Sequence, residues 1–194
     1  QVFVRDDGTV KLARNELYYW KGSIDLIILT GDYQGLSTRG QYILVQSILQ
    51  LVQEYGTNRI YTLGGYGVGV EVDEPTVTGA ATHPELIEEL EEYGIVFKDK
   101  GGGGIVGASG LLLGIGKMMD MEGVCLMGET SGYMVDPGSA REVLRTLASI
   151  LDIDIGFAKL EEKAEEISKI AQRIKQLEQS SGGDTEAGDL NYIG

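Results

Sequence analysis

Residues 24–30 read Ile-Asp-Leu-Ile-Ile-Leu-Thr, a nearly continuous run of branched apolar side chains. Such a strand is typical of a parallel sheet that is covered on both faces. Ser37 or Thr38 can then cap a helix whose apolar residues recur at spacings of three and four as far as about Tyr55. A second strand is predicted at residues 59–63. Together these elements predict one strand–helix–strand unit of a parallel sheet.

The alternation of strands and helices continues along the chain. The turn sequence Asp6-Asp7-Gly8 predicts a hairpin near the start. Further strands are predicted at residues 95–97 and 124–127, and helices at residues 84–92, 111–119 and about 137–151, with Thr82 and Ser109 as N-terminal caps of the first two. Residues 1–156 are therefore predicted to form an α/β three-layer sandwich with a mostly parallel sheet.

The residues after Phe157 have a different pattern and predict a C-terminal helix over residues 157–179. The 4-3-4-3 spacing of a heptad seam is followed by Leu160, Ala164, Ile167, Ala171 and Ile174. Fewer than three heptads do not make an autonomous coiled coil, so this helix must pack on its own domain or on another subunit. Residues 180–194 are rich in Ser, Gly and Asp and predict a flexible tail.

The charge of the chain restricts its partners. The formal net charge is -14, from 30 acidic and 16 basic residues. A chain this acidic repels phosphate groups, which argues against nucleic acid and anionic membrane surfaces and favours protein partners. No apolar run is long enough to span a membrane, and the start does not resemble a signal peptide. Because the first residue is Gln1 rather than Met, we expect that residues before it have been removed.

The cysteine and histidine content gives little support to catalysis. The single cysteine, Cys125, lies in an apolar run and is predicted to be a buried core thiol, which fits a reducing, cytoplasmic location. The single histidine, His83, has no second histidine or cysteine with which to form a zinc site. Nothing resembling Gly-x-Ser-x-Gly surrounds Ser109. We therefore expect a protein that is not an enzyme and that has neither a metal nor a cofactor.

Two glycine-rich stretches are the remaining candidates for a ligand site. Gly64, Gly65 and Gly67 follow a predicted strand, where α/β folds place ligands. Gly103 and Gly104 lead into the helix that Ser109 would cap, and a helix N-terminus can hold an anion. The alternative is that these glycines only allow tight turns and close packing of strands and helices. The sequence leaves both interpretations open.

Three motifs resemble those of the proteasome assembly chaperone family of archaea. They are Thr-Leu-Gly-Gly-Tyr-Gly at residues 62–67, the glycine-rich run at residues 103–114, and residues 124–133, which are followed by Asp136-Pro137 and a helix. The resemblance implies a nucleoside phosphorylase-like α/β fold, a homo-oligomer, and a role in assembly or activation of the proteasome core. Its implied partners are proteasome α-subunits or a paralogous chaperone. Family members begin with a strand and helix that have no counterpart here.

The C-terminal residues also bear on this resemblance. Proteasome activators commonly end in a hydrophobic residue, a tyrosine and a last residue whose carboxylate meets a lysine. The candidate residues for docking are Leu190, Tyr192, Ile193 and Gly194, with Tyr192 third from the end. We interpret the chain as a homo-oligomeric assembly chaperone that binds proteasome subunits or a related chaperone through its C-terminal helix and tail. The alternatives are an ATP-independent proteasome activator and a small-molecule-binding protein or enzyme that uses the glycine-rich loops.

Overall fold

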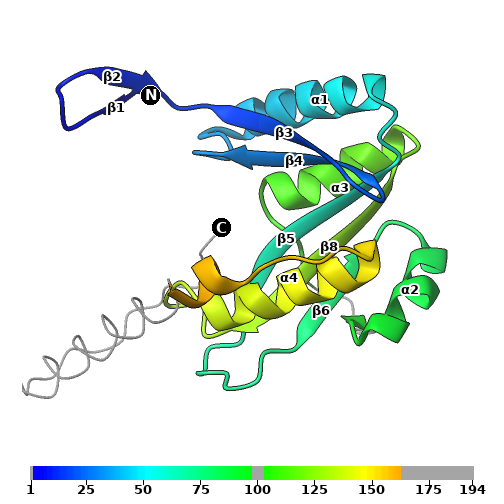
Figure 1. The fold of residues 1–194 in the computed structure, drawn as a ribbon. Helices are drawn as coiled ribbons and strands as arrows, with labels where there is room; N and C mark the ends of the chain where they lie inside the picture. The colour runs from blue at the N-terminus through cyan, green and yellow to red at the C-terminus, as the bar shows by residue number, and fades with distance from the viewer. Residues whose placement is uncertain (1, 98–102, 163–194) are drawn as a thin grey trace, which may run out of the picture. The chain divides into compact units, whose positions relative to one another are not determined.

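The computed structural model describes residues 2–97 and 103–162, which form an α/β fold (Figure 1). The strands are β1 (Val2–Val4), β2 (Val10–Leu12), β3 (Asn15–Lys21), β4 (Asp25–Gly31), β5 (Arg59–Gly67), β6 (Val77–Ala81), β7 (Val96–Phe97) and β8 (Glu122–Thr130). The helices are α1 (Thr38–Glu54), α2 (Pro84–Leu90), the 3-10 turn η1 (Glu91–Tyr93), α3 (Ala108–Met118) and α4 (Pro137–Leu151).

The central sheet has four strands in the order β5-β8-β6-β7. Backbone hydrogen bonds give the direction of β8 relative to β5. At one end of β8 the N–H of Glu122 donates to the carbonyl of Asn58 over 2.8 Å. At the other end the N–H of Val68 donates to the carbonyl of Thr130 over 2.9 Å. Because both positions advance together along the chain, β5 and β8 are parallel.

On its other side β8 pairs with β6. The N–H of Thr82 donates to Gly123, whereas the N–H of Glu129 donates to Thr76, each over 2.9 Å. The two positions advance in opposite directions, so β6 is antiparallel to β8. β6 and β7 are parallel. The central sheet is therefore mostly parallel, as the sequence predicts, with one antiparallel pair inside it.

The apolar run at residues 24–30 differs from its prediction. It forms β4, which pairs antiparallel with β3 from Asn15↔Gly31 to Lys21↔Asp25 in a separate two-stranded sheet. The prediction of a parallel strand covered on both faces is wrong here, because most of β4 is exposed. β4, α1 and β5 therefore do not form a strand–helix–strand unit of one sheet. A continuous apolar run has no period that reveals its partner, and the short connection between β3 and β4 favours a hairpin.

The described chain divides into two compact units. The first holds the described parts of Gln1–Thr62, Ala81–Leu86 and Gly101–Cys125, and the second holds those of Leu63–Ala80, Ile87–Lys100 and Leu126–Gly194. β5 and β8 each contribute residues to both units.

The core of the first unit lies under one face of α1. Ser37 caps this helix as predicted, because its hydroxyl accepts a hydrogen bond from the N–H of Gly40 over 3.1 Å. The residues that recur at spacings of four and three on its inner face, Val45, Leu49 and Val52, are buried and form a cluster with Met121. Side chains of α3 pack against the same cluster. The apolar spacing in the sequence therefore predicts the buried face of α1 correctly, except that Tyr42, which has the same spacing, is half exposed.

In the second unit, α4 packs against the last part of β8. The helix begins after Asp136, whose carboxylate accepts from the N–H of Ser139 over 2.9 Å, and it ends at Leu151 as predicted. A side chain at Gly128 of β8 would collide with Ser139 and Val143 of α4. Glycine at this position therefore permits the helix to lie directly on the strand.

Two predicted caps are wrong. α3 begins at Ala108 with Gly107 as its N-cap, so Ser109 lies inside the first turn of the helix. The side-chain oxygen of Gln34 accepts from the N–H of Ala108 over 3.0 Å and takes the place of the expected hydroxyl. The hydroxyl of Thr82 does not cap α2. It accepts a hydrogen bond from the N–H of Gly123 over 2.8 Å, which joins the segment before α2 to β8.

We predict that Leu49→Ala lowers the free energy of unfolding by about 2–5 kcal/mol, because it opens a cavity beneath α1. Leu51→Ala is the matched control, since Leu51 lies on the same helix and is 40% exposed. It should cost less than about 1 kcal/mol. Urea unfolding followed by circular dichroism measures both values. Equal losses for the two variants would contradict this assignment of the core.

Candidate functional site

The single histidine is engaged within its own segment. The Nδ1 atom of His83 lies 2.8 Å from the hydroxyl of Thr82, and the ammonium of Lys117 donates to the carbonyl of Thr82 over 2.6 Å. His83 thus pairs with Thr82, and Ser109 lies in the first turn of α3. Among residues 2–97 and 103–162, no group of three His, Cys, Asp or Glu side chains is placed to hold a metal ion.

The cysteine is a core residue, as predicted. Cys125 is 1% exposed in the middle of β8. Burial raises the pKa of its thiol above the ordinary value of 9.0, and the neighbouring Thr62 hydroxyl lowers it by a smaller amount. Within the described part of the chain, that hydroxyl is buried and has no hydrogen-bond partner of standard geometry. A raised pKa suppresses the thiolate, so this environment is the opposite of the one that activates a nucleophile.

The first set of candidate glycines lies inside β5 and not in a loop after it. A side chain at Gly65 would press on Thr130 at 3.2 Å, and one at Gly67 would meet the backbone of Gly132 at 3.6 Å. Gly64 is less restricted, with Met127 at 3.8 Å. Two of these glycines thus permit close approach to the end of β8, which is the packing role that the sequence left open.

The second set of candidate glycines has a different environment. Gly103 and Gly104 lie in an irregular segment before α3, and a side chain added at either would meet no atom within 4 Å. Gly107 has a φ of 89° and lies against Gln34. Because the side chain of Gln34 already accepts from the first N–H of α3, part of the predicted anion site is taken by the protein itself.

A cavity of about 290 Å³ lies where the chain leaves α4. Its lining consists of Arg145, Ala148, Ser149, Asp152, Ile153, Asp154, Ile155 and Phe157. Arg145 makes two bonds of 2.7 and 2.8 Å to the carboxylate of Glu142, and its guanidinium lies 5.9 Å from the centre of the Phe157 ring. The segment that leads to the C-terminal residues is therefore held against α4.

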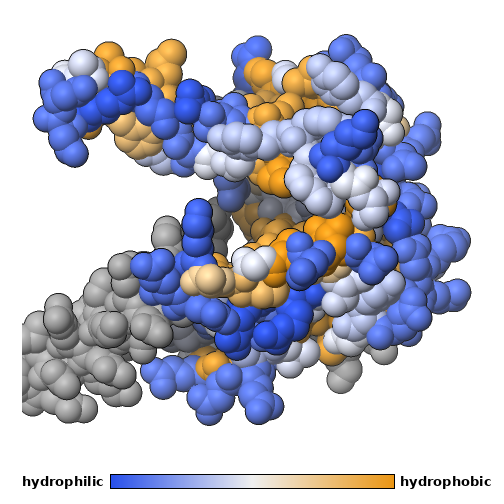
Figure 2. Space-filling view, viewed as in Figure 1, coloured by the Kyte–Doolittle hydropathy of each residue, from blue (hydrophilic) through white to orange (hydrophobic). Residues whose placement is uncertain are grey.

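Large exposed apolar areas are the most prominent feature of the first unit. The hairpin of β1 and β2 carries exposed aliphatic side chains, visible as orange atoms on the projecting ribbon in Figure 2. β3 exposes three aromatic residues, Tyr18, Tyr19 and Trp20. Apolar areas of this extent are covered in folded proteins by further elements of the same chain, by a partner or by a ligand. Residue types alone do not predict that the apolar side chains of this hairpin share one side, although valines alternate on either side of Asp6-Asp7-Gly8.

The predicted C-terminal site lies largely outside the described residues. The docking residues Leu190, Tyr192, Ile193 and Gly194 fall there, and so do four of the five seam residues, Ala164, Ile167, Ala171 and Ile174. Leu160 is described and lies in a helical stretch at residues 158–162. Within the described part of the chain, every helix is too short or too polar to cross a membrane.

The comparison with known proteins decides the family. The sequence matches the PAC2 family over residues 1–175. The chain belongs to the PAC2 family. A relative described as an uncharacterized protein, MJ1210 of Methanocaldococcus jannaschii, is 40% identical over 199 residues, which cover 100% of this chain and 77% of that protein. The resemblance inferred from the three motifs is confirmed.

Solved structures of the same fold include two from Pyrococcus furiosus. PbaB, described as an archaeal proteasome activator, is 41% identical with a TM-score of 0.84, over 90% of this chain and 77% of PbaB. PbaA, described as an archaeal homolog of proteasome-assembly chaperone, is 24% identical with a TM-score of 0.73, over 93% of this chain and 73% of PbaA. The PbaA match shows the shared fold, and the PbaB match is a closer relationship.

We predict that Cys125 reacts far more slowly with a thiol reagent in the folded protein than in guanidinium, where the reaction should be complete.

The raised pKa of Cys125 also predicts how the free energy of unfolding changes with pH. Since the unfolded thiol ionises first, the stability that the neutral thiol contributes is present below pH 9 and falls as the pH rises above 9. The stability difference between wild type and Cys125→Ala should therefore shrink by up to about 1.4 kcal/mol per pH unit. Urea unfolding of both proteins between pH 7 and pH 10 tests this, and a widening difference would contradict it.

Proposed function

We propose that this chain is a homo-oligomeric, ATP-independent protein that binds the proteasome core particle and activates it. The observation that carries the proposal is the 41% identity with PbaB over 90% of the chain, since PbaB is described as an archaeal proteasome activator. The tail sequence around Leu190 and Tyr192 supplies the hydrophobic and aromatic residues that such docking uses. In this proposal the tail enters a pocket between ring subunits and Tyr192 contacts the gate.

The described part of the chain supports a binding role. Its thiol is buried, and its histidine is paired locally. Binding energy in protein interfaces is concentrated in a few buried aromatic and aliphatic anchors.

Assembly of the proteasome is the second candidate function. It is favoured by the fold shared with PbaA, which is described as a proteasome-assembly chaperone homolog. A chaperone must hold subunits before the core particle is complete, whereas an activator acts on the finished particle. The two functions therefore predict different outcomes when the protein is mixed with free α-subunits and with mature core particles.

We predict that the full-length protein co-elutes with archaeal core particles at micromolar concentration and raises peptide hydrolysis in buffer without ATP. Tyr192→Ala should weaken binding by at least about tenfold, which is the loss typical of an interface anchor. Tyr55→Ala is the matched control, because Tyr55 is an exposed tyrosine at the end of α1. It should leave both binding and hydrolysis unchanged.

The outcomes separate the candidates. Stimulated hydrolysis that depends on Tyr192 supports activation. Faster assembly of free subunits, with no effect on mature particles, supports the chaperone role instead. Failure to bind either mature particles or free α-subunits would refute the proposal altogether.

A further inference from the structure

Residues 152–157, which we call the strap, run back along the end of α4 (Figure 1). The chain reverses at Asp152, whose φ of 49° lies in the left-handed region that often follows the last turn of a helix. The N–H of Ile153 then donates to the carbonyl of Ala148 over 3.0 Å. This bond fixes the first end of the strap to the helix that precedes it.

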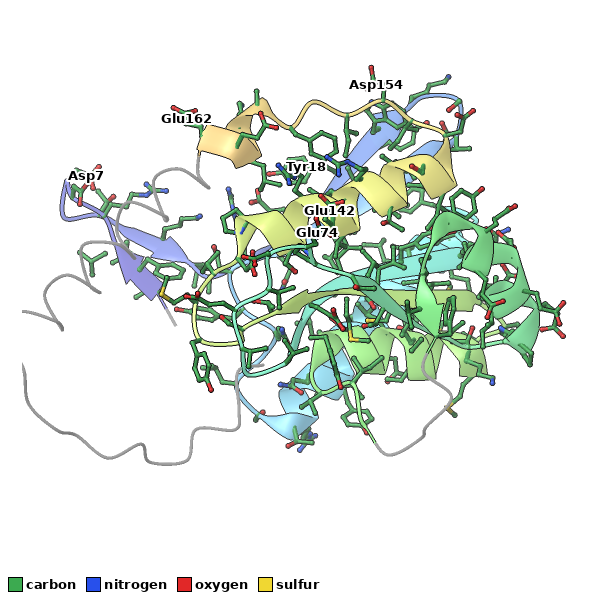
Figure 3. All side chains as sticks on the ribbon, turned by 90° about the horizontal axis from the view of Figure 1, so that it is seen from below. Asp7, Tyr18, Glu74, Glu142, Asp154 and Glu162 are labelled. Atoms are coloured by element: carbon green, nitrogen blue, oxygen red, sulfur yellow. The ribbon has the colours of Figure 1, made fainter. Side chains whose placement is uncertain are left out.

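The strap has an apolar inner side and a polar outer side. Exposure alternates along it, with three partly buried residues, Ile153, Ile155 and Phe157, separated by exposed ones. The same three residues line the cavity of about 290 Å³ together with residues of α4. Figure 3 shows Asp154 on the outer side, where it points away from α4. The alternation is that of an extended segment packed on an apolar surface, so the strap lies on α4 through its inner side.

Arg145 holds the second end of the strap. Its guanidinium lies 5.9 Å from the centre of the Phe157 ring, within the range of a cation–π contact. Two bonds of 2.7 and 2.8 Å to the carboxylate of Glu142 orient the same guanidinium. Because a cavity lies beneath the strap, its apolar side chains contact α4 only in part. The contact with Arg145 therefore carries more of the attachment than it would over a filled core.

Phe157 also begins the helical stretch at residues 158–162. Its carbonyl accepts from the N–H of Leu160 over 2.8 Å and from that of Glu161 over 3.0 Å. The ring and the carbonyl belong to one residue, so the contact that places the ring also places the first turn of this stretch. Arg145 thus acts on the position of residues farther along the chain.

We propose that Arg145 is a positioning residue for the docking of the C-terminal residues on the proteasome. By holding Phe157 on α4, it sets the direction in which the helical stretch at residues 158–162 leaves the domain. The inference rests on the proposed function and deepens it, because it gives a role in docking to a side chain of α4. Orienting a segment before it binds lowers the conformational entropy that binding costs.

The first test measures the strap in the full-length protein. Arg145→Gln should speed hydrogen exchange at residues 158–162 by about two- to fivefold, which is the change expected from losing an exposed cation–π contact. Phe157→Leu should have the same effect, and the double variant should exchange no faster than Phe157→Leu alone. Urea unfolding checks that the midpoint of the global transition stays close to that of the wild type.

Arg141→Gln is the matched control. Arg141 lies one turn earlier on α4 and also contacts Glu142, over 3.4 Å. The substitution removes the same charge from the same helix and leaves the pair of Arg145 and Phe157 in place. It should change neither the exchange at residues 158–162 nor the binding to core particles.

The second test measures docking on archaeal core particles. Arg145→Gln should weaken binding of the full-length protein by about two- to fivefold, in step with its effect on exchange. In a Tyr192→Ala background the same substitution should weaken binding no further, because a positioning residue acts only through the residues that it positions. A residue that merely stabilises the domain would give equal losses in both backgrounds.

Three results would overturn the inference. These are unchanged exchange in Arg145→Gln, an equal effect of Arg141→Gln, and losses that add to that of Tyr192→Ala. Binding that does not depend on Arg145 would refute its positioning role and leave the proteasome role intact. Binding to neither core particles nor free α-subunits would refute the proteasome role, and with it the role of Arg145 in docking.

Discussion

β8 is the element on which the rest of the fold depends. Val124, Cys125 and Leu126 at its centre are almost fully buried, and it hydrogen-bonds to β5 on one side and to β6 on the other. Its first half approaches α3, where Gly123 lies against Leu113, and its second half approaches α4 at Gly128. A side chain larger than glycine at either position would force a helix away from the strand. Both compact units draw residues from this strand, so a disturbance of β8 would weaken both cores.

The sequence predicted elements best where local chemistry determines them. The cap at Ser37, the period of α1 and the span of α4 with its Asp136 cap all depend on interactions within one turn of the chain. The strand at residues 24–30 was also predicted, but its partner was not. Pairing depends on segments distant in sequence, and an apolar run fits a parallel central strand or a hairpin equally well.

The candidate site was predicted less well, for related reasons. Gly64, Gly65 and Gly67 were placed in a loop because glycine is typical of turns, whereas β5 continues through them to meet the end of β8. Residue type predicts Ser109 as a cap, yet Gln34, distant in sequence, supplies the capping oxygen. The hairpin surface was visible as an alternation of valines, but only register shows that all four aliphatic residues lie on one side. Neither long-range hydrogen bonds nor cross-strand register can be read from residue types alone.

The contacts of Arg145 with Glu142 and Phe157 have a consequence for the docking of C-terminal residues that we propose. The bonds to Glu142 orient Arg145 within α4, and the contact with Phe157 holds the chain against this helix as far as residue 157. In the homo-oligomer that we propose, the points where the chain leaves this contact would repeat at set distances. Docking of one C-terminal segment on a multi-subunit ring would then hold the others at a high effective concentration near their own sites. Individually weak contacts then add up to strong attachment, and the spacing of the exit points selects which rings can be engaged by several copies at once.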